Sequence, residues 1–199
     1  MYALKLAMIG CLTLLSAFAI AEVREGVIDE FFPSEVTFEY EGKPLRLQMT
    51  GESIRKKFFV NVYSVAHYLQ EGPFDSGVSK FQAILNDDKA KQLTFKWLRT
   101  VEVAKVRDGY DESFKKILSQ SEYAQLKNEI TQFLSYYNVE VRKGDEHILR
   151  WLPRGNIEVI IKGNQVGNII NPAFAKALWS IWLGDKTVVD REKLVSLLQ

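Results

Sequence analysis

The segment TGESIRKKFFVNVYSVAHYL, residues 50–69, holds the longest β-type run of the chain. Thr50-Gly51-Glu52 breaks the pattern at its start, and we expect one strand from Ile54 to Leu69. Successive side chains of a strand point to opposite faces. The even positions form a nearly pure apolar face, whereas the odd positions mix apolar side chains with Arg55, Asn61, Tyr63 and His67. A mixed face of this kind fits either a cleft for an amphipathic ligand or a solvated sheet surface.

The spacing within this strand limits which residues could share a site. In a straight strand, Arg55 and Tyr63 would lie about 26 Å apart at roughly 3.3 Å per residue. They could then hold one small head group only if the chain turned or bulged near Lys56-Lys57. Asn61 and Tyr63, about 7 Å apart on the same estimate, could share a site in a straight strand.

The flanking sequence predicts further strands and helices in a definite order. Alternating apolar residues indicate strands, and apolar residues at spacings of three and four indicate helices. The predicted strands are 35–40, 45–49, 92–99, 147–152, 156–162 and 165–170, and the predicted helices are 78–86, 103–117, 123–137, 172–183 and a short one after Asp190. Strands, then helices, then strands and a helix favour an α+β fold with an antiparallel sheet and helices on one face.

The predicted helix from Pro172 to Leu183 is apolar nearly all round. Asn171 before it is expected to cap its first turn. A helix with this pattern is either buried between layers or faces a cavity. Trp179 and Trp182 therefore belong either to the core or to the wall of an apolar pocket, and core is the simpler interpretation.

The first twenty-one residues predict a signal peptide. Lys5 supplies a cation, residues 6–15 are almost unbroken apolar, and Ala19 and Ala21 occupy the −3 and −1 positions of a cleavage site after Ala21. The apolar run is too short to span a bilayer, which needs about 20 residues. We therefore expect a mature domain of residues 22–199 that is secreted to the periplasm, with no membrane anchor after cleavage.

Charge and cysteine content exclude several classes of function for that mature domain. Loss of Lys5 leaves 25 Lys and Arg residues against 25 Asp and Glu residues, so no basic excess favours nucleic acid. The one cysteine, Cys11, falls within the predicted signal peptide, which excludes a thiol nucleophile and cysteine zinc sites. His67 and His147 are the two histidines, and neither belongs to a metal or catalytic motif. We expect no metal and no cofactor.

Residues 50–69 resemble the signature segment of bacterial secreted chalcone isomerase-like proteins. In that family a turn containing glycine precedes an arginine, and a strand with Val-Tyr, then Ala, then Tyr-Leu follows. The later run FAKALWSIWLG, residues 174–184, looks like the C-terminal helix of the same family. The resemblance covers roughly residues 36–198 and implies an open-faced antiparallel β-sheet packed against a helical layer, with a cleft between them.

The resemblance also implies roles for particular residues. Arg55 matches the arginine that meets the anionic oxygen or carboxylate of the ligand, both in plant enzymes that close a flavanone ring and in related fatty-acid-binding proteins. The catalytic threonine of the family falls on Tyr63, which keeps a hydroxyl. The helix tyrosine falls in the segment that contains Tyr110, and the terminal Ser/Thr position falls near Ser180 or Ile181.

Three hypotheses about function follow: a binding protein, an enzyme, and a structural or partner-binding domain. The first is non-catalytic binding of a fatty acid or similar amphipathic anion, for which the predicted ligand-binding residues are Arg55, Phe59, Asn61, Tyr63, Tyr110, Trp179 and Trp182. The second is an isomerase or lyase of the chalcone isomerase type, with Arg55, Tyr63 and Tyr110 as its candidate catalytic residues. The third is a partner-binding domain whose cleft has filled with side chains. The sequence names no protein partner.

Overall fold

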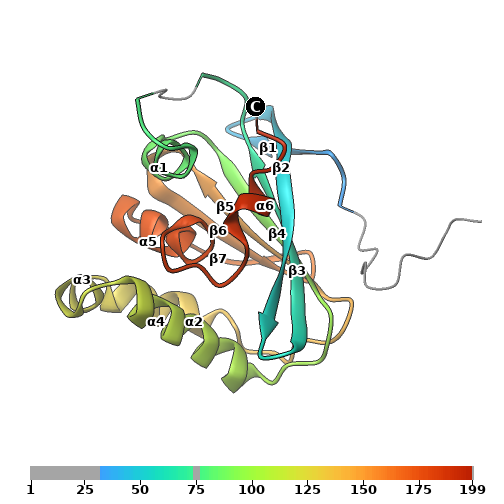
Figure 1. Ribbon diagram of the computed structural model, residues 1–199, viewed down its shortest axis with the longest axis vertical. Coiled ribbons are helices and arrows are strands. Elements are labelled where there is room, and N and C mark those ends of the chain that lie inside the picture. The colour runs from blue at the N-terminus through green and yellow to red at the C-terminus, as the bar shows by residue number, and fades with distance from the viewer. Residues whose placement is uncertain (1–31, 74–76, 199) are drawn as a thin grey trace, which may run out of the picture.

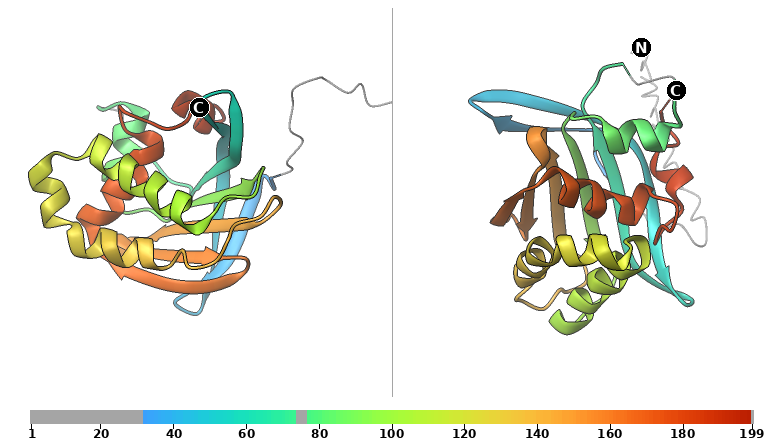
Figure 2. Two further views of the ribbon diagram at one scale, coloured as in Figure 1. Left: turned by 90° about the horizontal axis from the view of Figure 1, so that it is seen from below. Right: turned by 90° about the vertical axis from the view of Figure 1, so that its left-hand side faces the viewer.

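The computed structural model describes residues 32–73 and 77–198. The predicted signal peptide, residues 1–21, and the domain boundary at residue 22 lie outside the described residues. Within them, the chain forms a seven-stranded antiparallel sheet that curls around a layer of helices (Figures 1 and 2). The predicted α+β class, an open-faced antiparallel sheet packed against helices, is therefore confirmed.

The spatial order of the strands in the sheet is the same as their order in the sequence, because each strand pairs with the one before it. Its strands are β1 (Glu35–Tyr40), β2 (Lys43–Lys57), β3 (Val60–Leu69), β4 (Lys91–Trp97), β5 (Glu146–Leu152), β6 (Asn156–Ile161) and β7 (Asn164–Ile170). The long connection between β4 and β5 carries most of the helical layer, which Figure 2 shows inside the curve of the sheet.

The helices are α1 (Lys80–Asn86), α2 (Val103–Ile117), α3 (Gln120–Gln125), α4 (Lys127–Ser135), α5 (Pro172–Leu183) and α6 (Arg191–Leu194), with a 3₁₀ turn at Pro153–Gly155. The single helix predicted over 123–137 is instead the pair α3 and α4. The break falls at Leu126, whose φ of −98° and ψ of 9° leave the helical region. The apolar spacing runs through this break, so the pattern gave no sign of it.

The predicted strand Ile54–Leu69 is wrong in one respect that matters for function. The segment folds back at Phe58-Phe59, so that β2 and β3 form a hairpin in which Lys57 pairs with Val60 and Arg55 pairs with Tyr63. Phe58 adopts a left-handed φ of 57°, which costs a residue with a side chain about 1–2 kcal/mol. Two-residue hairpin turns favour Asn-Gly or Asp-Gly, and two phenylalanines hide the turn from sequence analysis.

A bend in β2 replaces the break expected at Thr50-Gly51-Glu52. The strand continues through these residues with a register shift between Met49 and Gly51. Gly51 has a φ of 150°, and a Cβ there would collide with the backbone of Lys193 and Leu194 at the end of α6. The glycine therefore both permits the bend and lets α6 approach the strand.

Helix α5 lies at the centre of the main core. Asn171 caps it as predicted, because its side chain accepts hydrogen bonds from the backbone N–H groups of Ala173 and Phe174. Eight of its apolar side chains are buried against the concave face of the sheet, with α1 and α2 packed beside the helix: Phe174, Ala175, Ala177, Leu178, Trp179, Ile181, Trp182 and Leu183. Of the two interpretations of this helix, the buried core is the correct one.

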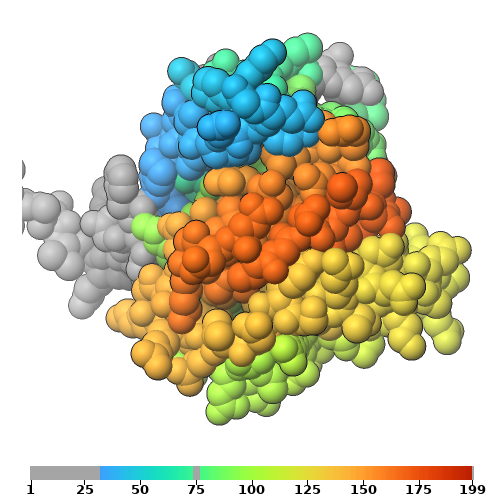
Figure 3. Space-filling model, turned by 180° about the vertical axis from the view of Figure 1, so that it is seen from behind, coloured from blue at the N-terminus to red at the C-terminus, as the bar shows by residue number. Residues whose placement is uncertain are grey.

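A smaller apolar cluster lies outside the main core, under β1 and the first half of β2. Leu47, Ala66, Tyr68 and Leu152 are its buried centre, and Phe38 is stacked 3.9 Å from the guanidinium carbon of Arg150. Figure 3 shows the β1–β2 hairpin in blue, covering one end of the orange strands. The first half of β2 thus covers this outer cluster, while its second half lies over the helices.

Substitution of Gly51 by alanine tests the bend. We expect Gly51→Ala to lower the free energy of unfolding by about 3 kcal/mol, because backbone strain adds to overpacking against Lys193 and Leu194. Gly42→Ala is the matched control, since Gly42 also has a positive φ but nothing within 4 Å of an added Cβ. Urea unfolding measures both. Equal losses in the two variants would contradict the close approach of α6.

Candidate ligand-binding cleft

A cleft of about 540 Å³ opens between the β2–β3 hairpin, the end of β4 and helix α2. Arg55 and Lys57 enter it from β2, Val62 and Tyr63 from β3, Trp97 from β4, and Gly109 and Tyr110 from α2. The cleft is open in this structure, so the third hypothesis, in which side chains fill it, is not supported.

The β2–β3 hairpin sets Arg55 and Tyr63 side by side in this cleft. The guanidinium carbon of Arg55 lies 5.9 Å from the centroid of the Tyr63 ring. On the facing helix, a Cβ added at Gly109 would lie 4.0 Å from Nη2 of Arg55. The missing side chain at Gly109 therefore leaves room beside the guanidinium.

Tyr63 and Tyr110 each have a hydrogen-bond donor behind them. The indole Nε1 of Trp182 donates to the Tyr63 hydroxyl at 3.0 Å, and the Tyr137 hydroxyl donates to the Tyr110 hydroxyl at 3.0 Å. A phenol has one proton of its own to donate. Since both oxygens already accept from the core side, each can give its own proton to a group in the cleft.

The electrostatics of this end of the cleft favour an anion. Burial acts to lower the pKa of Arg55, but Tyr63, Tyr110 and Glu112 act in the opposite direction and the net pKa lies above its ordinary value. Burial, together with Tyr137 and Tyr63, raises the pKa of the Tyr110 hydroxyl well above its ordinary value. At neutral pH the site therefore presents a guanidinium cation beside a neutral phenol donor.

The remaining walls differ in character from this polar end. Val60, Val62, Trp97 and Val106 give the cleft apolar surface. At the rim, Lys57 lies 3.6 Å from Glu112, and both side chains are more than half exposed. A cationic end and apolar walls suit a ligand that is itself amphipathic.

The structure brings together three of the seven residues predicted to bind ligand. Arg55, Tyr63 and Tyr110 line the cleft, and their binding role stays a prediction. Trp182 is fully buried beneath the cleft and contributes through its hydrogen bond to Tyr63. Trp179 was misplaced, because it is fully buried against Trp151, with ring centroids 5.5 Å apart, and does not line the cleft.

Two further predicted residues lie away from the cleft because the hairpin changes the direction of the chain. Phe59 occupies the tip of the turn and is completely exposed. Asn61 pairs with Lys56 just after the turn and is not among the lining residues. Ser180, near the expected terminal Ser/Thr position, donates to the carbonyl of Lys176 within its own helix and also lies outside the cleft.

Sequence analysis missed three contributors to the site. Tyr137 belonged to an apolar helical stripe and gave no sign of supporting Tyr110. Gly109 and Trp97 gave no sign of lining a cleft, since neither belongs to a motif. A helical glycine facing a predicted ligand arginine is the signal that could have revealed Gly109.

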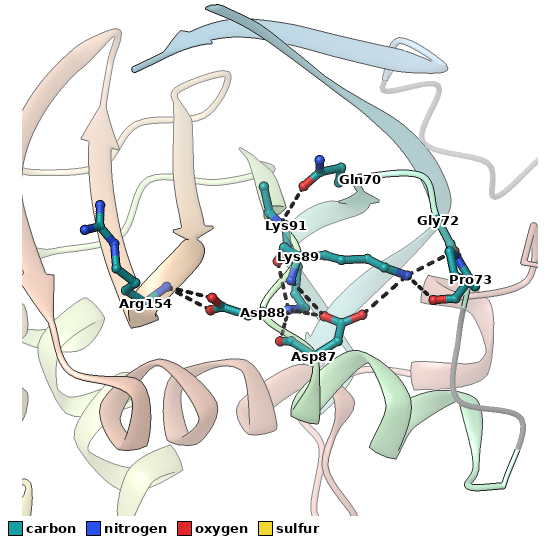
Figure 4. Close-up of polar contacts among 9 residues, drawn as sticks. Gln70, Gly72, Pro73, Asp87, Asp88, Lys89, Lys91 and Arg154 are labelled. Atoms are coloured by element: carbon teal, nitrogen blue, oxygen red, sulfur yellow. Dashed lines mark hydrogen bonds and ion pairs between the residues drawn. The ribbon is translucent and has the colours of Figure 1, made fainter. Parts of the chain in front are cut away.

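A second polar cluster, at the start of β4, is structural (Figure 4). Nζ of Lys91 is buried and lies 2.7 Å from Oδ1 of Asp87, 2.9 Å from the Asp87 carbonyl and 4.1 Å from the ring centroid of Trp151. Asp88 accepts a hydrogen bond from the backbone N–H of Arg154. Asp87 and Asp88 thus tie their loop to β4 and to the 3₁₀ turn.

The described residues contain no group of three or more His, Cys, Asp or Glu side chains able to hold a metal ion. None of the helices among residues 32–73 and 77–198 is both long and apolar enough to cross a membrane.

The two histidines are buried structural residues. Thr50 Oγ1 lies 2.6 Å from Nδ1 of His67 and donates its own proton to the Leu194 carbonyl at 2.7 Å, so Nδ1 of His67 is the donor of that pair. His147 packs against Trp97 behind the cleft, and neither of its ring nitrogens has a hydrogen-bond partner among the described residues.

Residues 32–195 match the family model described as chalcone isomerase-like. The chain belongs to the chalcone isomerase-like family. This confirms the resemblance stated from residues 50–69 and 174–184.

A solved structure agrees with this family membership. The crystal structure of a fatty-acid binding protein from Arabidopsis thaliana superposes with a TM-score of 0.68, covering 82% of this chain and 90% of that one at 15% identity. At this identity the likeness shows that the two proteins share the chalcone isomerase-like fold. No curated protein sequence matches the chain significantly.

The buried histidines predict a loss of stability in mild acid. Burial first, then Lys91, lowers the pKa of His67 to about 3, and burial lowers that of His147 to about 4. The unfolded chain takes up protons below about pH 6.5 while the folded chain does not, so acid favours unfolding. Each histidine should contribute about 1.4 kcal/mol per pH unit between pH 6 and pH 4.5.

Urea unfolding across this pH range measures the effect, with His147→Leu as the variant. We expect the variant to lose about half of the histidine contribution to the slope of unfolding free energy against pH, whatever its stability at pH 7. An unchanged slope would show that His147 titrates equally in the folded and unfolded chain.

Proposed function

We propose that this chalcone isomerase-like protein binds a fatty acid or similar long-chain anionic amphiphile in its cleft, without chemical conversion, after export to the periplasm. The observation that carries the proposal is the group of Arg55, Tyr63 and Tyr110 at one end of an apolar-walled cleft of about 540 Å³. Small-molecule sites commonly have volumes of about 300–1,000 Å³.

The polar end matches a carboxylate in charge and in donor number. A guanidinium is permanently charged and offers parallel N–H donors that fit the two oxygens of a carboxylate. The free protons of Tyr63 and Tyr110 add two neutral donors. Because Trp182 and Tyr137 fix these hydroxyls from behind, the donors are held in place before a ligand arrives.

Two further observations support this function. The Arabidopsis protein of the same fold is named a fatty-acid binding protein. The apolar run at residues 6–15, followed by Ala19 and Ala21, supports export and therefore a periplasmic location.

The same three donors support one alternative function. Donors that converge on one oxygen can stabilise the negative charge that develops in an isomerase or lyase reaction. Arg55 would then act on an enolate-like oxygen while Tyr110 or Tyr63 exchanged a proton. Turnover of a chalcone substrate distinguishes this alternative from binding alone.

Substitution of Arg55 tests the proposed function. The protein is purified in the form that cells accumulate, its intact mass is recorded, and palmitate binding is measured by titration calorimetry. We expect Arg55→Gln to weaken binding about tenfold to a hundredfold, because a hydrogen bond to a charged group contributes about 1.5–3 kcal/mol. Arg142→Gln, at an exposed arginine that does not line the cleft, is the matched control and should bind nearly as tightly as the native protein.

Two outcomes of this experiment would contradict fatty-acid binding. One is a native protein that binds no fatty acid in titration and retains none in native mass spectrometry. The other is equal affinity of Arg55→Gln and Arg142→Gln. Conversion of a chalcone by the native protein, abolished in Arg55→Gln, would favour the isomerase alternative.

Gly109 allows a second test at the facing wall. Gly109→Ala should keep palmitate affinity and stabilise α2 by about 1 kcal/mol, since its Cβ would make only ordinary contact with Arg55. Gly109→Leu should abolish most binding by filling the space beside the guanidinium. Titration and urea unfolding of the pair separate a blocked cleft from an unfolded protein. Native affinity in Gly109→Leu would place the ligand elsewhere.

A further inference from the structure

The tip of the β2–β3 hairpin combines exposed aromatic side chains with basic ones. Phe58 and Phe59 are 88% and 101% exposed, and Val60 is 46% exposed. Arg55, Lys56 and Lys57 precede them directly in the chain. Soluble domains do expose single apolar residues, but three in succession on a projecting turn are a recognised sign of an interaction site.

The backbone conformation of the turn also suggests that its phenylalanines have a role outside the fold. Phe58 holds a left-handed φ of 57°, a conformation that glycine or asparagine would adopt with much less strain. Neither aromatic ring is buried, so burial in the core does not offset the cost of that strain. The tip therefore carries features that the isolated fold does not use.

The hairpin tip lies at the edge of the cleft. Phe58 and Val60 line the cleft, whereas Phe59 does not. Figure 2 (right) shows the β2–β3 hairpin projecting at one corner of the molecule. A surface that received Phe59 would thus lie beside the opening of the cleft.

We propose that the hairpin tip inserts Phe58 and Phe59 into the interface of an anionic lipid bilayer, so that the cleft opens toward the membrane. This inference rests on the proposed function for its purpose, which is exchange of an amphiphile between membrane and cleft. Aromatic side chains favour the interfacial region of a bilayer, and basic residues beside them are attracted to anionic head groups.

The charges near the hairpin tip favour an anionic lipid surface over a neutral one. Lys56 and Lys57 are exposed, and Arg99 and Lys105 add basic charge at the cleft rim. Glu102, Asp108 and Glu112 oppose them there. The pair between Lys57 and Glu112 is exposed at 3.6 Å, so it is weak and leaves Lys57 able to meet a phosphate.

Vesicle co-sedimentation tests the proposal. The protein is used in the form in which it is purified from cells. The vesicles are phosphatidylcholine alone, or phosphatidylcholine with one quarter phosphatidylglycerol. We expect binding to the anionic vesicles and weaker binding to the neutral ones. Phe59→Ser should weaken anionic binding about tenfold or more, and Lys56→Gln about fivefold.

Ile170→Ser is the matched control, since Ile170 is an apolar residue 67% exposed on β7, far along the sheet from the hairpin. It should bind vesicles as the native protein does. Equal binding of Phe59→Ser and Ile170→Ser would overturn the proposal. So would an absence of native binding to both kinds of vesicle.

Palmitate titration in the absence of vesicles keeps this test separate from that of the proposed function. Phe59→Ser should keep native palmitate affinity, because Phe59 does not line the cleft. Arg55→Gln should lose palmitate affinity and keep most vesicle binding through the aromatic tip. Loss of palmitate binding in Phe59→Ser would overturn the separation between tip and cleft on which the proposal depends.

Discussion

The burial of α5 is the constraint on which the rest of this structure depends. An apolar helix of twelve residues has no stable place in water, so the sheet must curl around it and the other helices must cover it. The same burial brings the Trp182 indole to the Tyr63 hydroxyl, where it donates the hydrogen bond that holds this side chain. The core thus fixes one of the polar groups of the cleft directly.

The sequence predicted most of the architecture because its periodic signals are local. Alternation at residues 35–40 and 147–170, and the stripes on the helices, depend on a few neighbouring residues and match the observed elements. The turn at Phe58-Phe59 could not be predicted in this way, because its residues are typical of strands and its geometry is specified by pairing across the hairpin. The break at Leu126 was hidden for the same kind of reason.

The candidate site was predictable only as far as the family resemblance reached. Arg55, Tyr63 and Tyr110 came from matching motifs, and the straight-strand model kept the first two far apart. The hairpin resolves that conflict by placing them opposite each other. Phe59, Asn61 and Trp179 were misplaced because side-chain direction near a turn, or within a layer, depends on tertiary packing. Tyr137 was missed because its role is a contact with another helix.

The bend of β2 at Gly51 affects the order of folding, because it is held by contacts with the last residues of the described chain. The backbone N–H of Leu197 donates to the carbonyl of Thr50, and the Thr50 hydroxyl donates to the carbonyl of Leu194. These contacts join positions more than 140 residues apart in sequence. Pairings of such long range form late in folding, because the loop between them must be closed first. A nascent chain would therefore keep this corner open until residues 194–197 had been synthesised and could reach Thr50.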